Sequence, residues 1–384
     1  MTYSIHSVEI PDTTALRRKP NPKDGVISEE QLHNFDDKYL FYDVFIDPDV
    51  DELVGIGPPA LNVKPYVEGM TVWVNGRQVK FSFVDYPEHK VCLLKARVPH
   101  AERYEVVLEF SDATHEMTLL KDPSRDSSRT PKAPGRKVLT AISKNNTVEW
   151  IDEWIDFYKA NYGIDDVFIY DNGSDNLEAL EARVGAKANI VRWNFPFGPT
   201  AKRFSSFAQP VALNHCLKRF AKGGVLFNFD IDELLIADQE RIMQAVSRHK
   251  VVYFESHNVP YVNPGKRDYS FRDFRYRYPE RKKTARKFVC DADANFLISP
   301  HNTWVKKNYL LASRLKRNKP DALVDAESYF LHFLGITTNW QPDLNKLKEV
   351  PTESLVEDDS HIRMMPRSAG ESAEAMAKGP AGER

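Results

Sequence analysis

Two carboxylates one residue apart follow a short apolar run in the middle of the chain. The run covers residues 225–229, and Asp230 and Asp232 come directly after it. Side chains at alternate positions of an extended segment point the same way, so both carboxylates can face one ion. Carboxylate oxygens are the ligands that Mg²⁺ and Mn²⁺ prefer, and substrate phosphates often complete the shell. The pair therefore predicts a metal site. Alternatively, Asp230 and Asp232 begin a solvated turn, and Glu233 opens the next helix.

The segments before this pair predict the elements that position it. Short apolar runs alternate with segments of helical periodicity, which predicts an α/β fold with a mainly parallel sheet. The expected strands are 138–142, 166–170, 188–193 and 225–229, and the expected helices follow residue 147 and cover 177–184 and about 204–220. Sheets of this kind bind ligands beyond the carboxyl ends of their strands. Asp171, after the second strand, and Asp230, after the fourth, are therefore expected on one edge.

The remaining sequence predicts five regions. Residues 1–60 read as an extended N-terminal arm. Short alternating strands indicate a small antiparallel β-rich accessory module over 61–122, with Asn75-Gly76 as a hairpin turn. A linker rich in Pro, Ser, Arg and Lys covers 123–136, and the α/β domain covers 137–365. A disordered tail of small and charged residues is expected over 366–384.

The composition and the first residues of the sequence limit the binding partners and the cellular location that we expect. The 384 residues carry 53 basic and 55 acidic side chains, which gives no support for general binding to nucleic acid or to a membrane surface. The first residues lack a signal-peptide pattern, and no transmembrane segment is expected. A cytoplasmic location is the expectation, and peripheral membrane contact stays open.

A set of segments resembles glycosyltransferase family 92 and its family 2-like bacterial relatives. The segments are 148–155, 163–175, 209–220 and 229–235, within a region of resemblance from about residue 137 to 340. The resemblance implies the GT-A fold and a metal-dependent hexosyltransferase, inverting, that uses a nucleotide sugar such as a UDP-sugar. It also implies a role in polysaccharide biosynthesis, with a glycan or lipid-linked acceptor.

Several residue roles follow from the same resemblance. Asp230 and Asp232 would hold Mn²⁺ or Mg²⁺ on the donor diphosphate. Asp171, with Asn172 beside it, matches the position that contacts the base, although Asp171 could instead form a turn. Arg286 and Lys287 resemble a basic pair that meets donor phosphates, or they form an exposed strand end.

A histidine often completes the metal shell in this fold. The resemblance favours His332, which lies in an aromatic segment, and His301 is the alternative. A neutral imidazole is a suitable third ligand beside two carboxylates. Either histidine could instead be a hydrogen-bonded core residue.

The acceptor side is less defined. Arginines and tyrosines alternate over residues 266–286, which fits an acceptor loop for an acidic glycan or lipid-linked substrate. Nucleic-acid binding or a solvated loop would give the same pattern. An inverting transfer needs a carboxylate as base. The candidates are Asp268, Asp273, Glu280, Asp291 and Asp293.

Two other functions fit the acidic pair. Haloacid-dehalogenase-type phosphatases use the first carboxylate of such a pair as nucleophile, which would be Asp230. Their motif occupies the first strand of the domain, whereas three expected strands precede the strand that ends at Asp230 here. A non-catalytic carbohydrate-binding protein is the other alternative.

Overall fold

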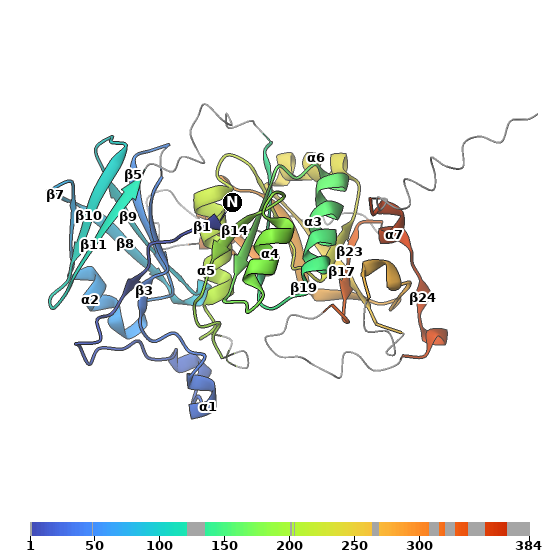
Figure 1. Cartoon of the computed structure of the whole chain (residues 1–384), viewed down its shortest axis with the longest axis horizontal. Helices are drawn as coiled ribbons and strands as arrows, with labels where there is room; N and C mark the ends of the chain where they lie inside the picture. The colour runs from blue at the N-terminus through green and yellow to red at the C-terminus, as the bar shows by residue number, and fades with distance from the viewer. Residues whose placement is uncertain are drawn as a thin grey trace, which may run out of the picture.

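A large mixed β-sheet runs through the centre of the computed structural model (Figure 1). The structure describes residues 2–47, 49–120, 135–199, 202, 204–262, 269–306, 315–318, 327–336 and 350–366. Among these, nine strands form the sheet in the order β1-β14-β13-β12-β15-β19-β17-β23-β16. Their bounds are β1 (Thr2–Tyr3), β12 (Lys137–Ser143), β13 (Asp166–Asp171), β14 (Asn189–Arg192), β15 (Val225–Asn228), β16 (Glu233–Ile236), β17 (Val251–Val259), β19 (Arg281–Asp291) and β23 (Tyr329–Phe333).

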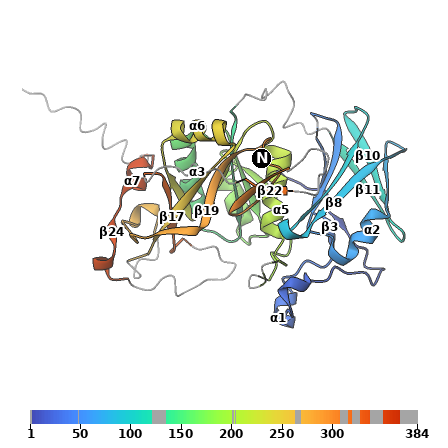
Figure 2. The ribbon, with the colours of Figure 1, turned by 180° about the vertical axis from the view of Figure 1, so that it is seen from behind.

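The expected α/β class is confirmed, and the sheet has two different halves. From β1 to β15 neighbouring strands are parallel. β19 then runs antiparallel to both β15 and β17, and β16 runs antiparallel to β23, whereas β17 and β23 are parallel. Figure 2 labels β17 and β19, which lie side by side. The sheet is therefore parallel in its first half and mixed in its second.

Helices cover both faces of this sheet. α3 (Val148–Tyr162), α4 (Leu177–Val184) and α6 (Gln239–His249) pack on one face. α5 (Ala208–His215), which continues as a π-helical turn over Cys216–Phe220, packs on the other. Strand β13 shows why both faces need cover, since Val167 and Ile169 face the first layer while Phe168 and Tyr170 face the second.

The N-terminal part forms two four-stranded antiparallel sheets, drawn in blue to cyan beside α5 in Figure 1. One has the order β4-β5-β9-β8 and the other β11-β10-β6-β7. We call these two sheets the N-terminal module. Their strands are β4 (Asp43–Asp47), β5 (Glu52–Gly57), β6 (Thr71–Val74), β7 (Arg77–Val79), β8 (Phe81–Tyr86), β9 (Val91–Arg97), β10 (Arg103–Glu109) and β11 (Thr114–Leu120).

The hairpin at Asn75-Gly76 is confirmed, with φ values of 50° and 71° at the two turn residues. The expected boundary at residue 60, between an extended arm and the β-rich module, is wrong. β5 pairs with β9 along its whole length, so β4 and β5 belong to the module, and β1 adds to the large sheet. The alternation of apolar and polar residues in these early strands is short, so the sequence pattern did not predict them as strands. Residues 121–134 of the linker region and 367–384 of the tail lie outside the described residues.

Smaller elements complete the described chain, and no helix within it is long and apolar enough to cross a membrane. They are β2 (Val8–Glu9), α1 (Glu29–Leu32), β3 (Tyr39–Phe41), α2 (Lys64–Glu68), β18 (Tyr276–Arg277), β20 (Leu297–Ser299), β21 (Asn302–Lys306), β22 (Leu315–Arg317), β24 (Val356–Glu357) and α7 (Ser360–Met364).

A buried ion cluster joins the N-terminal module to the helix layer. Asp43, at the start of β4, accepts hydrogen bonds from His215 Nε2 at 2.7 Å and from Arg219 Nη1 at 2.6 Å. Its other oxygen accepts the backbone N–H of His6 at 2.8 Å. Burial alone would raise the pKa of Asp43, but Arg219 and His215 together lower it to about 2. The carboxylate is therefore ionised and fully paired.

We expect Asp43→Asn to lower the free energy of unfolding by roughly 3 kcal/mol, because it leaves Arg219 without its buried partner. Folding lowers the pKa of Asp43 from its ordinary 3.8, so its ionised form stabilises the native state above about pH 4. This contribution is lost as the pH falls towards 2. Urea unfolding at several pH values should show the gap between wild type and variant closing at acid pH. The exposed Asp12→Asn is the control, and a gap that persists unchanged at acid pH would contradict the assignment.

Candidate functional site

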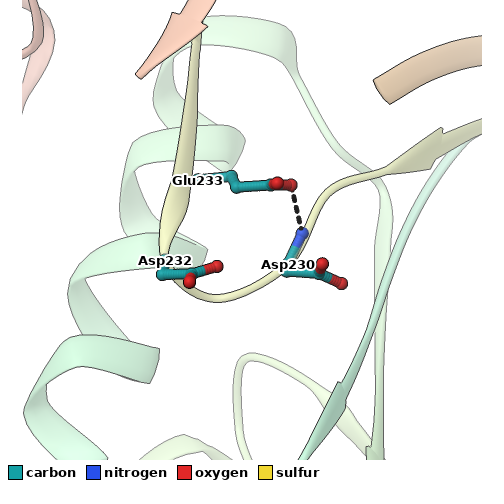
Figure 3. Close-up of side chains that lie close together, drawn as sticks. All are labelled: Asp230, Asp232 and Glu233. Atoms are coloured by element: carbon teal, nitrogen blue, oxygen red, sulfur yellow. Dashed lines mark hydrogen bonds between the residues drawn. The ribbon is translucent and has the colours of Figure 1, made fainter. Parts of the chain in front are cut away.

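Three carboxylates meet in the turn that joins β15 to β16. Asp230, Asp232 and Glu233 each offer an oxygen, and these oxygens lie within 4.8 Å of one another (Figure 3). The Glu233 side chain accepts the backbone N–H of Asp230 at 2.8 Å, which closes the turn. Asp230 and Asp232 do lie in a partly exposed turn, but Glu233 opens strand β16 and not a helix, so the expected helix after the turn is wrong. We call these three residues the acidic cluster.

Lys287 of β19 lies beneath the acidic cluster. Its Nζ is 2.5 Å from Asp230 Oδ2 and 3.2 Å from Glu233 Oε2, and its side chain is only 1% exposed. The antiparallel pairing of β15 with β19 places it there, since Asn228 pairs with Phe288. The expected exposed or phosphate-binding role of Lys287 is therefore corrected, because its ammonium group is buried against protein carboxylates.

The charges in this group shift one another's pKa values. Burial would raise the pKa of Asp230, but the charge and hydrogen bond of Lys287 hold it below its ordinary value. Burial raises the pKa of Glu233 to about 8, opposed by Lys287 and reinforced by Asp230 and Asp232. The pKa of Lys287 is raised, since its two carboxylate partners outweigh its burial. Lys287 thus offsets one negative charge of the cluster.

The two candidate histidines flank the acidic cluster on different sides. His332 pairs with Glu233 across β23 and β16, and its Nε2 lies 3.2 Å from Asp232 Oδ2. Its Nδ1 is 3.3 Å from Asn258 Oδ1. His301, in the turn between β20 and β21, donates from Nδ1 to the Arg286 carbonyl at 3.1 Å. Burial, with Lys287 adding to it, lowers the pKa of His301. His332 is the histidine in direct contact with the acidic pair.

Asp171 lies on the same edge of the sheet, as the sequence predicts. It ends β13 and pairs with Ser143 of β12, the strand that separates it from β15. Its Oδ2 accepts the N–H groups of Gly173 at 3.2 Å and Ser174 at 3.1 Å, while its buried Oδ1 has no partner among the described residues. Asp171 therefore forms the turn with one oxygen, while the other is buried next to it.

Asn172 has a structural role in this turn. Its amide Nδ2 donates to the carbonyls of Trp193 and Phe195 at 2.6 and 2.8 Å. Both amide hydrogens are used in this way, and the side chain is buried. The expected donor-binding role of Asn172 is therefore limited to its backbone and its amide oxygen.

The acidic cluster fits a divalent cation by its donor set. All three members offer carboxylate oxygen, and the side chains of Asp230 and Asp232 are 31% and 17% exposed, so solvent and a ligand can reach them. Hard cations prefer such oxygens, and one imidazole nitrogen beside them is compatible with Mn²⁺. Asp230 and Asp232 would hold the ion, with Glu233 beside Asp230 and His332 next to Asp232.

The expected catalytic bases that the structure describes lie at two opposite edges of the large sheet. Asp291 pairs with Val225 at the amino end of β15, opposite to Asp230, so it is excluded from the site, together with Asp293 beyond it. Asp273 accepts the N–H of Ser270 at 2.8 Å in a turn that follows β17 at the carboxyl edge. Glu280 is exposed at the same edge, before β19. Asp268 lies outside the described residues.

The basic stretch before β19 is partly internal. Arg277 donates to Asp358 at 2.6 Å and lies over the Tyr329 ring at 5.6 Å, so it ties the segment to the end of the described chain. Arg286 is 31% exposed, and its Nη2 lies 3.2 Å from Glu255 Oε1. The guanidinium of Arg286 thus has a carboxylate partner, while its Nε is buried without one among the described residues.

Comparisons with known proteins give no family. The chain matches no protein-family model, and no curated protein matches it. Among solved structures, it is similar to the crystal structure of amylomaltase from Corynebacterium glutamicum, at 17% identity and a TM-score of 0.13. The similarity covers 32% of this chain and 20% of that chain. A TM-score this low carries no argument about fold or activity.

We expect Lys287→Met to lower the free energy of unfolding by roughly 3 kcal/mol, because the buried Glu233 and the partly buried Asp230 lose the ammonium group that contacts both of them. Lys282→Met, at an exposed position of the same strand, is the matched control and should change stability by less than about 0.5 kcal/mol. Urea unfolding without added metal measures both. Equal stability of the two variants would show that Lys287 does not balance the cluster.

Proposed function

We propose that this chain is a metal-dependent glycosyltransferase of the GT-A fold, which transfers a sugar from a nucleotide-sugar donor, such as a UDP-sugar, to a glycan or lipid-linked acceptor with inversion. The observation that carries the proposal is the acidic cluster at the carboxyl edge of the parallel half-sheet, with His332 touching Asp232. Asp171, with one buried unpartnered oxygen, lies on the same edge. The sequence resemblance described above assigns these positions to the donor.

The residues of the acidic cluster, Lys287 and Asp171 would have different roles in donor binding. Asp230 and Asp232 would hold Mn²⁺ or Mg²⁺, which offsets the negative charge that develops on a leaving diphosphate. Lys287 fixes the orientation of Asp230 and reduces the repulsion between carboxylates before the ion arrives. Asp171 would contact the base through Oδ1, which has no partner among the described residues and would have to become accessible when the donor binds. Glu233 holds the turn through the Asp230 N–H.

The acceptor would enter from the segment between β17 and β19. Asp273 and Glu280 both lie in that segment, at the same edge as the acidic cluster, and remain the described candidates for the base. A base must come within hydrogen-bond reach of the acceptor hydroxyl. Of these two, Asp273 already accepts the Ser270 N–H, whereas Glu280 is exposed.

The test is a panel of nucleotide sugars with and without Mn²⁺, measuring release of the free nucleotide and the shift in melting temperature. We expect one donor to stabilise the wild type only with the metal. Asp232→Asn should reduce turnover by about 100-fold or more, since even outer partners of metal ligands cost 10–100-fold. Asp291→Asn, at the opposite end of β15, is the control and should keep wild-type turnover.

Two outcomes would overturn the proposal. One is that no nucleotide sugar stabilises the protein or releases nucleotide at saturating Mn²⁺. The other is that Asp232→Asn responds to the donor as strongly as the wild type. Trapping of an aspartyl phosphate on Asp230 would support the phosphatase instead.

A further inference from the structure

A cavity, separate from the acidic cluster, lies between the N-terminal module and the large sheet. Its volume is about 410 Å³, within the range of roughly 300–1,000 Å³ that small-molecule sites occupy. Four lysines line it, together with two aspartates, Asp47 and Asp293. The lysines are Lys95, Lys218, Lys222 and Lys306. We call this cavity the lysine pocket.

The lysines come from both parts of the molecule. Lys95 belongs to β9 of the N-terminal module. Lys218 lies in the π-helical turn after α5, Lys222 precedes β15, and Lys306 ends β21. No single helix or strand therefore produces the cluster. It exists only because the module packs against the helix layer.

Two of the four lysines have no carboxylate partner in the described residues. Lys95 pairs with Glu52, and Lys222 pairs with Asp47. Lys218 and Lys306 instead both lie over the aromatic ring of Phe296, with their Nζ atoms 4.5 and 4.4 Å from its centroid.

The surroundings of Lys218 disfavour its positive charge. It donates a hydrogen bond to the Phe296 carbonyl, a neutral acceptor. Burial lowers the pKa of Lys218 to about 7, and the charges of Lys95, Lys306 and Lys222 add to this effect. Asp293, which opposes the shift, accepts the Gly223 N–H at 3.0 Å with its Oδ1. An anion in the cavity would relieve the repulsion between the lysines.

The lysine pocket is separate from the acidic cluster. Lys222 precedes β15 and Asp230 follows it, so the two sites lie at opposite ends of this strand. Asp293 follows β19 at the same end as Lys222, because β19 runs antiparallel to β15. An inference about the lysine pocket therefore does not depend on the proposed glycosyl transfer.

We propose that the lysine pocket is a binding site for a small phosphate-bearing anion, held by Lys218 and Lys306 with support from Lys95 and Lys222. Phosphate oxygens accept several charge-assisted hydrogen bonds, and Lys binds them as a point charge without a fixed angle. The apolar lining by Val54, Leu217 and Val305 leaves room for a carbon skeleton beside the phosphate. Since the pocket is lined from both parts, its ligand also bridges the N-terminal module and the large sheet.

Calorimetric titration of the full chain tests this site with pyrophosphate and, separately, glucose 1-phosphate, in EDTA so that no divalent ion occupies the acidic cluster. We expect one-site binding that weakens as salt is raised. Lys306→Gln should weaken it by about tenfold or more, the loss of one charge-assisted hydrogen bond. Lys80→Gln, at an exposed lysine of the module, should leave it unchanged. Tighter binding of glucose 1-phosphate would show that the apolar lining contributes.

Asp232→Asn separates the lysine pocket from the acidic cluster. It should bind pyrophosphate in EDTA as the wild type does. Loss of binding in this variant, or equal binding by Lys306→Gln and wild type, would overturn the assignment.

A measurement on the wild type avoids any folding defect of a variant. Lysines are acetylated briefly with and without saturating pyrophosphate, and the modified peptides are quantified by mass spectrometry. We expect severalfold protection of Lys218 and Lys306 and none of Lys80. Equal labelling with and without the anion would overturn the proposal.

Discussion

The buried ammonium group of Lys287 is the interaction on which the candidate site depends. Asp230 and Glu233 approach each other in one tight turn, and two carboxylates at that distance repel strongly where water is scarce. Lys287, 1% exposed, contacts both and makes the arrangement tolerable. It reaches them because β19 pairs antiparallel with β15. The mixed half of the sheet therefore supplies the positive charge that offsets the carboxylates after β15. Asp232 lies beside His332 instead.

The position of the acidic cluster follows from strand order. β12 is the first strand of the α/β region, β13 and β14 extend the sheet to one side of it, and β15 returns to the other side. The direction in which strands are added to the sheet therefore reverses between β12 and β15. Open α/β sheets bind ligands in the crevice that such a reversal creates. Asp230 after β15 and Asp171 after β13 lie on either side of this point, which makes one ligand spanning both physically reasonable.

Residue periodicity in the sequence predicts the helices and strands that depend on nearby residues. The strand ending at Asn228, the helices over 148–162 and 177–184, and the shared edge of Asp171 and Asp230 all follow from periodicity and alternation. What the sequence could not show depends on pairing between distant segments. Lys287 looked exposed because its strand alternates poorly, and only its pairing with β15 reveals its burial. A helix start at Glu233 remained an alternative in the sequence because nothing nearby distinguishes it from an edge strand. The sequence does not reveal β5 because its partner β9 lies far along the chain.

The N-terminal module shares a hydrophobic core with the large sheet, and this limits what it can do. Tyr42 of the module stacks on Phe195 with ring centroids 3.8 Å apart and meets Trp193 edge-on at 5.4 Å. Together with the buried charge of Asp43, these contacts join the module to the layer that carries α5. Interfaces between independently moving domains are usually more polar and less tightly packed than a shared core. The N-terminal module therefore packs as part of one folded unit with the large sheet. A ligand bound between them would stabilise both.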